Sequence, residues 1–258
     1  RRVHGEFWWR FELNDKTNLP NISNFPFGSF FLITLKSPQP SSVTMATSSG
    51  STDFPKRGSF TSHHFISLVI VILLTASGMV SMQEVAFTIF SGIYIYFISK
   101  AVFPSKHHPT EKIIDASNKI FVCYITLGAI IGLFLPILYI LIGAFQGKKL
   151  AIKDAAPHLF LLASQVIMEG VTYNGNFSLP IRAFVPILYN SKRIFTLVDW
   201  LKSEGTKIGG RQGEYGRWAT LGMVLAVANM AFWCFNLFFF LLPVYLPRVF
   251  KNYYAIGE

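Results

Sequence analysis

Four long runs of apolar residues constrain this chain more than any other feature of its sequence. They cover about residues 65–82, 85–103, 120–145 and 219–242, and a helix needs ~20 mostly apolar residues to cross the hydrocarbon core of a bilayer. Only 14% of the 258 residues are charged and 52% are hydrophobic, whereas roughly a quarter of a soluble domain is charged. We therefore expect an all-α, polytopic helical membrane protein.

A fifth segment, residues 158–173, is marginal as a membrane span because it contains Glu169. A carboxylate near the bilayer centre costs about 2.5–3.5 kcal/mol, which seven Leu, Ile, Phe and Val side chains at about 0.3–0.6 kcal/mol each roughly cancel. The distribution of Lys and Arg residues decides whether this segment crosses the membrane. If the segment crosses and the N-terminus is cytoplasmic, thirteen Lys and Arg residues from Met45 onward lie in the cytoplasm and five outside; otherwise eight lie inside and ten outside. The positive-inside rule favours five crossings, with the C-terminus outside.

Proline and charge patterns add detail to this layout. Pro136 predicts a kink in the third span, and Pro243 and Pro247 predict the end of the last one. Residues 186–202 carry apolar side chains at helical spacing with basic residues and Trp200 among them. This pattern predicts a cytoplasmic interfacial amphipathic helix that lies on the membrane surface.

The N-terminal region differs in texture from the rest. Residues 1–44 show no steady period, and Met45 opens a Ser/Thr-rich polar stretch typical of a true N-terminus. We interpret residues 1–44 as a non-native or disordered extension and 45–64 as a polar cytoplasmic N-terminus. The membrane domain then covers 65–247, and residues 248–258 form a tail.

A polar stripe is predicted on the fifth segment. At 100° per residue, its four polar side chains share one face of a helix; they are His158, Gln165, Glu169 and Thr172. An intramembrane carboxylate beside an amide could form a proton or cation relay. The alternative is that Glu169 only ties helices together through hydrogen bonds. Both interpretations stay open from the sequence.

The last span offers partners for this stripe and for neighbouring spans. Asn229 and Asn236 lie one heptad apart and could donate hydrogen bonds to the stripe, or act as interhelical glue. Small residues four apart let helices approach closely, which predicts that the third and last spans pack together; these residues are Gly128, Gly132, Gly222 and Ala226.

Other function classes find little support. The net charge is +10, but the basic residues lie between apolar runs rather than on the face of a soluble domain, so we expect no nucleic-acid binding. Cys123 and Cys234 lie inside apolar runs with no ligand spacing, which predicts no metal site. The Gly-rich stretch 205–217 lacks the Lys-Ser/Thr of a phosphate loop, and no catalytic motif is present. We expect no cofactor, no catalytic residue and no enzyme activity.

Two blocks carry a family resemblance. They are "SQVIMEGVTYNGNFSLPIRAFVPILYNSKRIFTLVDWL" from Ser164 and "AVANMAFWCFNLFFFLLPVYLPRVFKNYY" from Ala226. They resemble a plant family of uncharacterised multi-pass transmembrane proteins, grouped only as a domain of unknown function, over roughly Phe60 to Tyr254. The resemblance implies an integral membrane protein of a plant and brings no activity or site residues with it.

These observations lead to one expected function and one alternative. We expect an uncharacterised, non-enzymatic membrane scaffold or partner-binding protein whose partners are the lipid bilayer and other membrane proteins, or further copies of itself. The alternative is a small transporter or channel that uses the Glu169 and Gln165 stripe. An endomembrane or plasma-membrane location is expected, and the Ser/Thr residues after Met45 leave a plastid envelope open.

Overall fold

The computed structural model describes residues 62–104, 119–174, 177–210 and 214–255, and all regular secondary structure in these ranges is helical. The expectations for residues 1–44 and for a start at Met45 lie outside the described residues. So do most of the predicted polar N-terminus, 45–64, and the last three residues of the predicted tail. The all-α fold class is confirmed for the described part of the chain.

Ten helical segments follow one another in these ranges. In chain order they are α2 (Ser62–Ala76), α3 (Met82–Ala101), α4 (Lys119–Ala129), the π-helix η2 (Ile130–Phe134), α5 (Leu135–Phe145), α6 (Lys149–Asn174), α7 (Leu179–Gly210), α8 (Glu214–Phe235), the π-helix η3 (Asn236–Tyr245) and α9 (Leu246–Ala255).

Three of the helical stretches are long and apolar enough to cross a membrane. They are Met82–Ala101, Val122–Phe145 and Gly216–Ala255. The five crossings expected from the sequence are therefore not confirmed. The 15 residues of α2 extend only about 22 Å at 1.5 Å per residue, less than the ~30 Å hydrocarbon core. Helix α6 begins with Lys149, Lys153 and Asp154 and contains Glu169, so its composition is too polar.

The last helix does not end at its prolines, contrary to the sequence prediction. Helices α8, η3 and α9 form one continuous stretch that passes through Pro243 and Pro247. Pro243 lies in a π-helix, where the amide of Leu246 donates to the carbonyl of Leu241, five residues back. A π-turn shifts the hydrogen-bond register, so the missing N–H of Pro243 does not end the helix.

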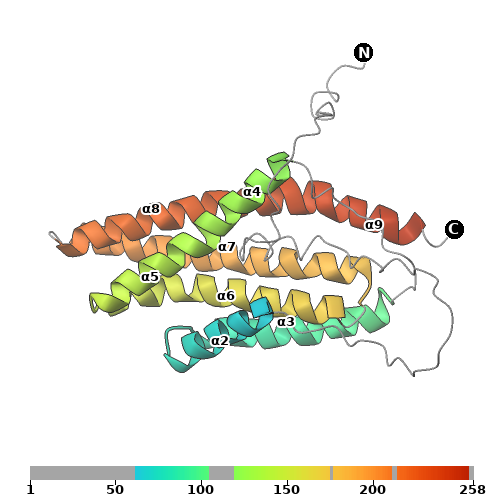
Figure 1. Cartoon of the computed structure of the whole chain (residues 1–258), viewed down its shortest axis with the longest axis horizontal. Coiled ribbons are helices and arrows are strands. Elements are labelled where there is room, and N and C mark those ends of the chain that lie inside the picture. Colours follow the sequence, from blue (N-terminus) through green and yellow to red (C-terminus); the bar gives the residue numbers. More distant parts are fainter. Residues whose placement is uncertain (1–61, 105–118, 175–176, 211–213, 256–258) are drawn as a thin grey trace, which may run out of the picture.

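The helices form layers around α6 and α7. Figure 1 shows α8 and α9 along one side of the bundle, α7 and α6 in the middle, and α2 and α3 along the other side. The α4–η2–α5 helix crosses the bundle and contacts α6 and α8. The most polar of the long helices thus lie inside, and the apolar helices surround them.

Helix α7 is not confirmed as an interfacial helix. It is longer than the predicted 186–202 and runs along both α6 and α8 (Figure 1). The Nζ atom of Lys207, near its end, donates to Asp154, near the start of α6, so the two helices are antiparallel. The physical reason for the error is that several polar side chains of α7, Arg193 among them, face α6 and α8 rather than water.

The direction of α7 also removes the support for the predicted orientation. The charge count placed Lys207 on the cytoplasmic side and Lys153 outside. Lys207 instead lies beside Asp154, the direct neighbour of Lys153. The basic residues of α7 are distributed along the bundle rather than gathered on one side, so the thirteen-to-five count does not hold.

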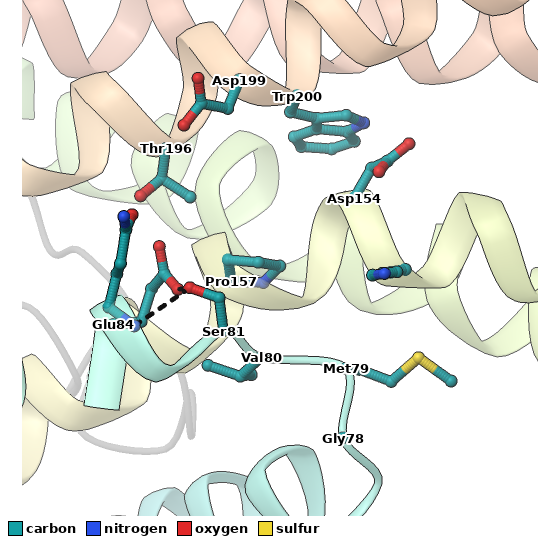
Figure 2. A pocket seen from close by; sticks show the side chains of 12 residues that line it. Gly78, Met79, Val80, Ser81, Glu84, Asp154, Pro157, Thr196, Asp199 and Trp200 are labelled. Atoms are coloured by element: carbon teal, nitrogen blue, oxygen red, sulfur yellow. Dashed lines mark hydrogen bonds between the residues drawn. The ribbon is translucent and has the colours of Figure 1, made fainter. Parts of the chain in front are cut away.

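A short turn, residues 77–81, joins α2 to α3 and packs against the middle helices. Gly78 has φ +65°, a left-handed conformation that favours glycine. Ser81 caps α3: its Oγ accepts from the amide of Gln83 at 3.2 Å and donates to the carboxylate of Glu84. Figure 2 shows this turn facing Pro157 of α6 and Thr196 of α7.

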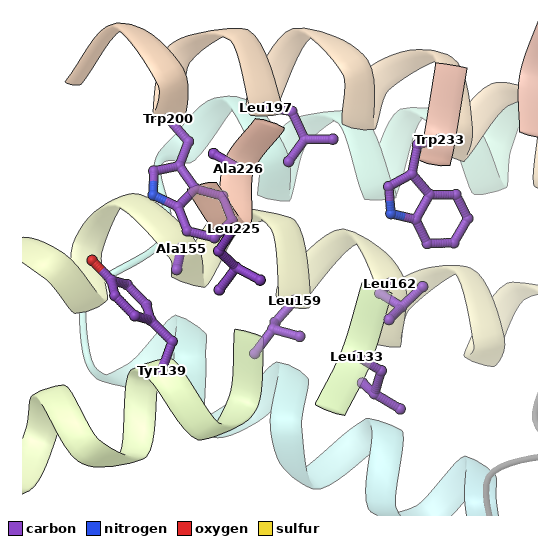
Figure 3. Packing of buried hydrophobic residues seen from close by; sticks show 10 residues of the cluster. All are labelled: Leu133, Tyr139, Ala155, Leu159, Leu162, Leu197, Trp200, Leu225, Ala226 and Trp233. Atoms are coloured by element: carbon purple, nitrogen blue, oxygen red, sulfur yellow. The ribbon is translucent and has the colours of Figure 1, made fainter. Parts of the chain in front are cut away.

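An apolar cluster joins five helical segments of the bundle. Trp200 of α7 and Trp233 of α8 pack there with Leu133 of η2, Tyr139 of α5 and Leu159 of α6 (Figure 3). By contrast, many large apolar side chains of the outer helices are exposed, for example Phe90 (63%) on α3 and Val224 (62%) on α8. Contiguous exposed apolar surface of this kind marks a membrane or protein contact surface.

Candidate functional site

The predicted polar stripe of α6 faces the interior of the bundle. His158, Gln165, Glu169 and Thr172 are all buried, and His158 and Thr172 have no exposed surface. The hydroxyl of Thr172 donates to the backbone carbonyl of Glu169 at 2.9 Å, a bond within its own helix. The other three side chains interact with neighbouring groups and form the site.

His158 bonds a backbone carbonyl of the π-helix η2. Its Nε2 donates to the carbonyl oxygen of Gly132 at 2.8 Å. In α-helical register that carbonyl would accept from residue 136, but Pro136 has no N–H. The imidazole lies between Trp200 and Trp233, with ring centroids 6.4 and 6.3 Å away. His158 thus ties α6 to the irregular turn of the neighbouring apolar helix.

Gln165 joins a carboxylate to a guanidinium. Its Nε2 donates to Oε1 of Glu169 at 2.8 Å, and its Oε1 accepts from Nη2 of Arg193 at 2.6 Å. Arg193 has no exposed surface, and its Cζ lies 4.0 Å from the centre of the Trp233 ring. A buried charge is stable only with an opposite charge and hydrogen bonds nearby. The stripe therefore continues from α6 onto α7 and α8.

Sequence reasoning missed Arg193 because it assigned this residue to a surface helix. A signal was present, since one face of α7 repeats at helical spacing and carries both large apolar and polar residues. These residues are all buried: Asn190, Arg193, Leu197, Trp200 and Glu204. Since Glu169 needs a cationic partner inside a bundle, this buried face was the place to look for one.

The guanidinium of Arg193 is not fully satisfied. Its Nε and Nη1 atoms are buried and make no hydrogen bond to any residue that the structure describes. A buried donor without an acceptor costs about 1–3 kcal/mol, and more when it is charged. This is the least satisfied group of the stripe.

The two asparagines of the last helix do not bond the stripe directly. Asn229 accepts from Nε1 of Trp233 at 3.3 Å and donates to the carbonyl of Leu225 at 3.0 Å, so it holds the ring on which Arg193 lies. Asn236 accepts from the hydroxyl of Tyr124 at 2.6 Å and thereby links η3 to α4. Both residues therefore join or position helices in this structure.

The small residues predicted to mediate packing all lie at helix contacts. A Cβ on Gly128 would lie 2.6 Å from Cζ of Phe232, and one on Gly132 would lie 2.7 Å from Cζ2 of Trp233. On α8, a Cβ on Gly222 would lie 2.6 Å from the hydroxyl of Tyr139, and Ala226 is fully buried. The third and last apolar helices therefore meet through glycines and aromatic rings.

A second buried carboxylate lies near the end of the bundle that holds the α2–α3 turn. Oε1 of Glu204 accepts from the hydroxyl of Tyr139 at 3.3 Å, from Nε1 of Trp200 at 3.2 Å and from Nζ of Lys207 at 3.2 Å. Lys207 also pairs with Asp154. Burial raises the pKa of Glu204 above its ordinary value, and Lys207 and Trp200 oppose this shift. Sequence reasoning did not identify this cluster.

The described residues contain no group of three or more His, Cys, Asp and Glu side chains arranged to hold a metal ion. The ionisable groups of the interior instead bind one another and the backbone of neighbouring helices. The site therefore holds charged and hydrogen-bonding side chains inside a shell of apolar helices.

Comparison with known proteins gives a match to one family model. The sequence model of a family described as "Domain of unknown function (DUF7733)" matches residues 58–254. No curated protein and no solved structure matches the chain. The matched region covers well over half of the sequence and includes every residue of the stripe and of the Glu204 cluster.

Proposed function

The chain belongs to the DUF7733 family, a domain of unknown function, and from this premise we propose that it is a non-enzymatic integral membrane protein that acts as a scaffold for partner proteins. Its three apolar helices are compatible with a membrane location. The partners we propose are the lipid bilayer and other membrane proteins, or further copies of the chain, in a plant endomembrane or plasma membrane.

One observation supports a structural role for the polar stripe over a transport role. The stripe is enclosed: Gln165 and Glu169 are 6% and 4% exposed, and Arg193 on the facing helix is fully buried. Gln165 and His158 direct their hydrogen bonds to α7 and η2, across helix contacts. Groups used in this way hold helices in register, which a scaffold needs, and their burial supports a closed interior.

Cysteine accessibility tests this proposal in native membranes, in a background free of Cys123 and Cys234. Ser164→Cys and Thr172→Cys place small, near-isosteric thiols at buried positions beside Gln165 and Glu169, and Thr206→Cys places one at an exposed position near the end of α7. A water-soluble thiol reagent should label position 206 but neither of the buried positions. All three should label after denaturation in detergent, which controls for expression and reactivity.

The second candidate function, a small transporter or channel that uses Glu169 and Gln165, is favoured by one feature. Two N–H groups of Arg193 lack an acceptor among the described residues, and a passing solute or water could supply it. Labelling of Thr172→Cys in the folded protein would favour this candidate and contradict the closed scaffold. Transport assays with Glu169→Gln would then be the next measurement.

A further inference from the structure

The α2–α3 turn lies short of the nearby ends of α6 and α7, and a pocket lies beside it. Residues of the turn line one side, and Pro157 of α6 and Thr196 of α7 line the other. Helix α6 begins eight residues before Pro157, and α7 continues well beyond Thr196. Both helices therefore extend past the α2–α3 turn by two helical turns or more. Figure 1 shows the turn short of the ends of α5 and α8. The pocket has a volume of about 450 Å³.

The walls of the pocket combine apolar and charged side chains. Met79 and Val80 of the turn, with Pro157 and Trp200 opposite, give it apolar surface (Figure 2). Five ionisable or amide groups also line it: Gln83, Glu84, Lys153, Asp154 and Asp199. The pocket therefore offers both apolar and charged surface to a ligand.

Two of the charges already have partners. Oε1 of Glu84 lies 3.7 Å from Nζ of Lys192. Asp154 pairs with Lys207 and accepts from the hydroxyl of Ser203 at 2.7 Å. Both carboxylates therefore already have a cationic partner within the protein.

One cation and one anion in the pocket remain. Lys153 lies on α6 and Asp199 on α7, and both are exposed. Within the part of the chain that the structure describes, neither forms an ion pair, with each other or with another side chain. A ligand that satisfies both must carry both charges, a negative group for Lys153 and a positive group for Asp199.

The rim of the pocket is apolar on the side of the hairpin. Met82, the first residue of α3, is 79% exposed, and Leu73 in the last turn of α2 is 63% exposed. Met82 directly follows the turn that lines the pocket, and Leu73 lies four residues before it. A ligand with a zwitterionic head and apolar chains would therefore find a surface for each part.

We propose that this pocket binds the headgroup of a zwitterionic phospholipid. Its phosphate pairs with Lys153, its ammonium group pairs with Asp199, and its acyl chains follow the exposed apolar surface of α2 and α3. The proposal goes beyond the scaffold function: it rests on the membrane location, and it holds whether the buried stripe is closed or open. The shared chemistry, an ammonium group next to a phosphate, also occurs in free phosphocholine, so the test separates the two sources.

Native mass spectrometry of the full chain in detergent measures this binding directly. The probes are phosphatidylcholine and phosphatidylglycerol with the same acyl chains, since the second keeps the phosphate but lacks the ammonium group. The wild type should bind phosphatidylcholine more tightly. Because each exposed ion pair contributes only modestly to binding, Lys153→Gln and Asp199→Asn should each weaken the binding of phosphatidylcholine about threefold. Asp199→Asn should also abolish the preference over phosphatidylglycerol.

A matched control and a competitor complete the test. Lys202→Gln removes an exposed charge from the same helix, outside the pocket lining, and should leave binding unchanged. Equal binding of the two lipids by the wild type, or a preference for phosphatidylcholine that survives Asp199→Asn, would overturn the proposal. Free phosphocholine that binds as tightly as the lipid would overturn the phospholipid as the source. Failure of phosphocholine to compete at lipid-like concentrations supports it.

Discussion

Arg193 shows how single residues define the interior of this protein. Its guanidinium donates to Gln165, which in turn donates to Glu169, and its flat face lies on Trp233. Removal of one partner of a buried ion pair costs about 3–5 kcal/mol, because it leaves an uncompensated charge. The position of α7 against α6 thus depends on three polar side chains in a mainly apolar environment.

A second residue-scale arrangement is the bond from His158 to the carbonyl of Gly132, whose donor in α-helical register would be residue 136, a proline without an N–H. We predict that His158→Phe lowers the free energy of unfolding by about 1–3 kcal/mol, because the buried carbonyl of Gly132 then loses its imidazole donor. In a Pro136→Ala background, the new amide can donate to that carbonyl, so the same substitution should cost less.

Thermal or denaturant unfolding in one detergent measures this coupling as a double-mutant cycle. Pro186→Ala provides the control, since Pro186 lies inside α7 and its substitution should be additive with His158→Phe. An unchanged cost of His158→Phe in the Pro136→Ala background would show that the histidine stabilises the bundle in another way.

At the scale of helices, Glu204 connects four segments. It bonds Tyr139 of α5 and Trp200 and Lys207 of α7, Lys207 reaches Asp154 of α6, and its carboxylate faces Gly222 of α8. A Cβ at position 222 would lie 2.7 Å from Oε1 of Glu204, so a larger residue there would displace this carboxylate. The packing of α8 is therefore coupled to the state of this carboxylate.

This coupling predicts a pH dependence of stability. Burial raises the pKa of Glu204 in the folded state above its ordinary value of 4.5. Folding therefore favours the protonated carboxyl group of Glu204. Its contribution to the free energy of unfolding is complete below pH 4.5 and is lost as the pH rises through the folded-state pKa. We predict that the unfolding midpoint of the wild type, relative to that of Glu204→Gln, falls as the pH rises above this value.

Unfolding midpoints of both proteins across about pH 4–8 test this prediction. Asp199→Asn serves as the control for the loss of a carboxylate from the same helix, because Asp199 is exposed. A difference between wild type and Glu204→Gln that is constant with pH would exclude a shifted pKa at this position.

At the scale of the whole molecule, polar and apolar side chains are distributed in the opposite way to those of a soluble protein. The most polar long helices lie inside, and the outer helices present large apolar side chains such as Phe97 (62%) and Phe239 (68%). Lipid chains solvate such a surface, whereas water would drive it to aggregate. The architecture therefore fits a bilayer as the solvent.

This distribution predicts how the chain behaves on membrane extraction. We expect the full chain to stay in the membrane pellet after alkaline carbonate treatment and to enter the supernatant only with detergent, because three long apolar helices cannot leave the bilayer at low cost. Immunoblotting of the fractions, with a peripheral membrane protein as a control, measures this. Release by carbonate alone would contradict membrane crossing.

The sequence by itself determined the helical class and the apolar stretches, because hydrophobic runs and their lengths are local properties of the chain. It also identified the stripe on α6, since 3.6-residue periodicity places His158, Gln165 and Glu169 on one face. These features need no knowledge of neighbouring helices, and the structure places them as helices with the stripe inward.

Only the tertiary structure decided which groups meet across the bundle. The basic residues of α7 suit a membrane surface as well as a buried face when the helix is taken alone, and the hydrogen bond from Arg193 to Gln165 selects the second for Arg193. Likewise, Pro243 ends an isolated α-helix, but a π-turn in a packed helix accommodates it. A buried charge or an irregular turn is stable only through partners distant in sequence, so no local pattern specifies it.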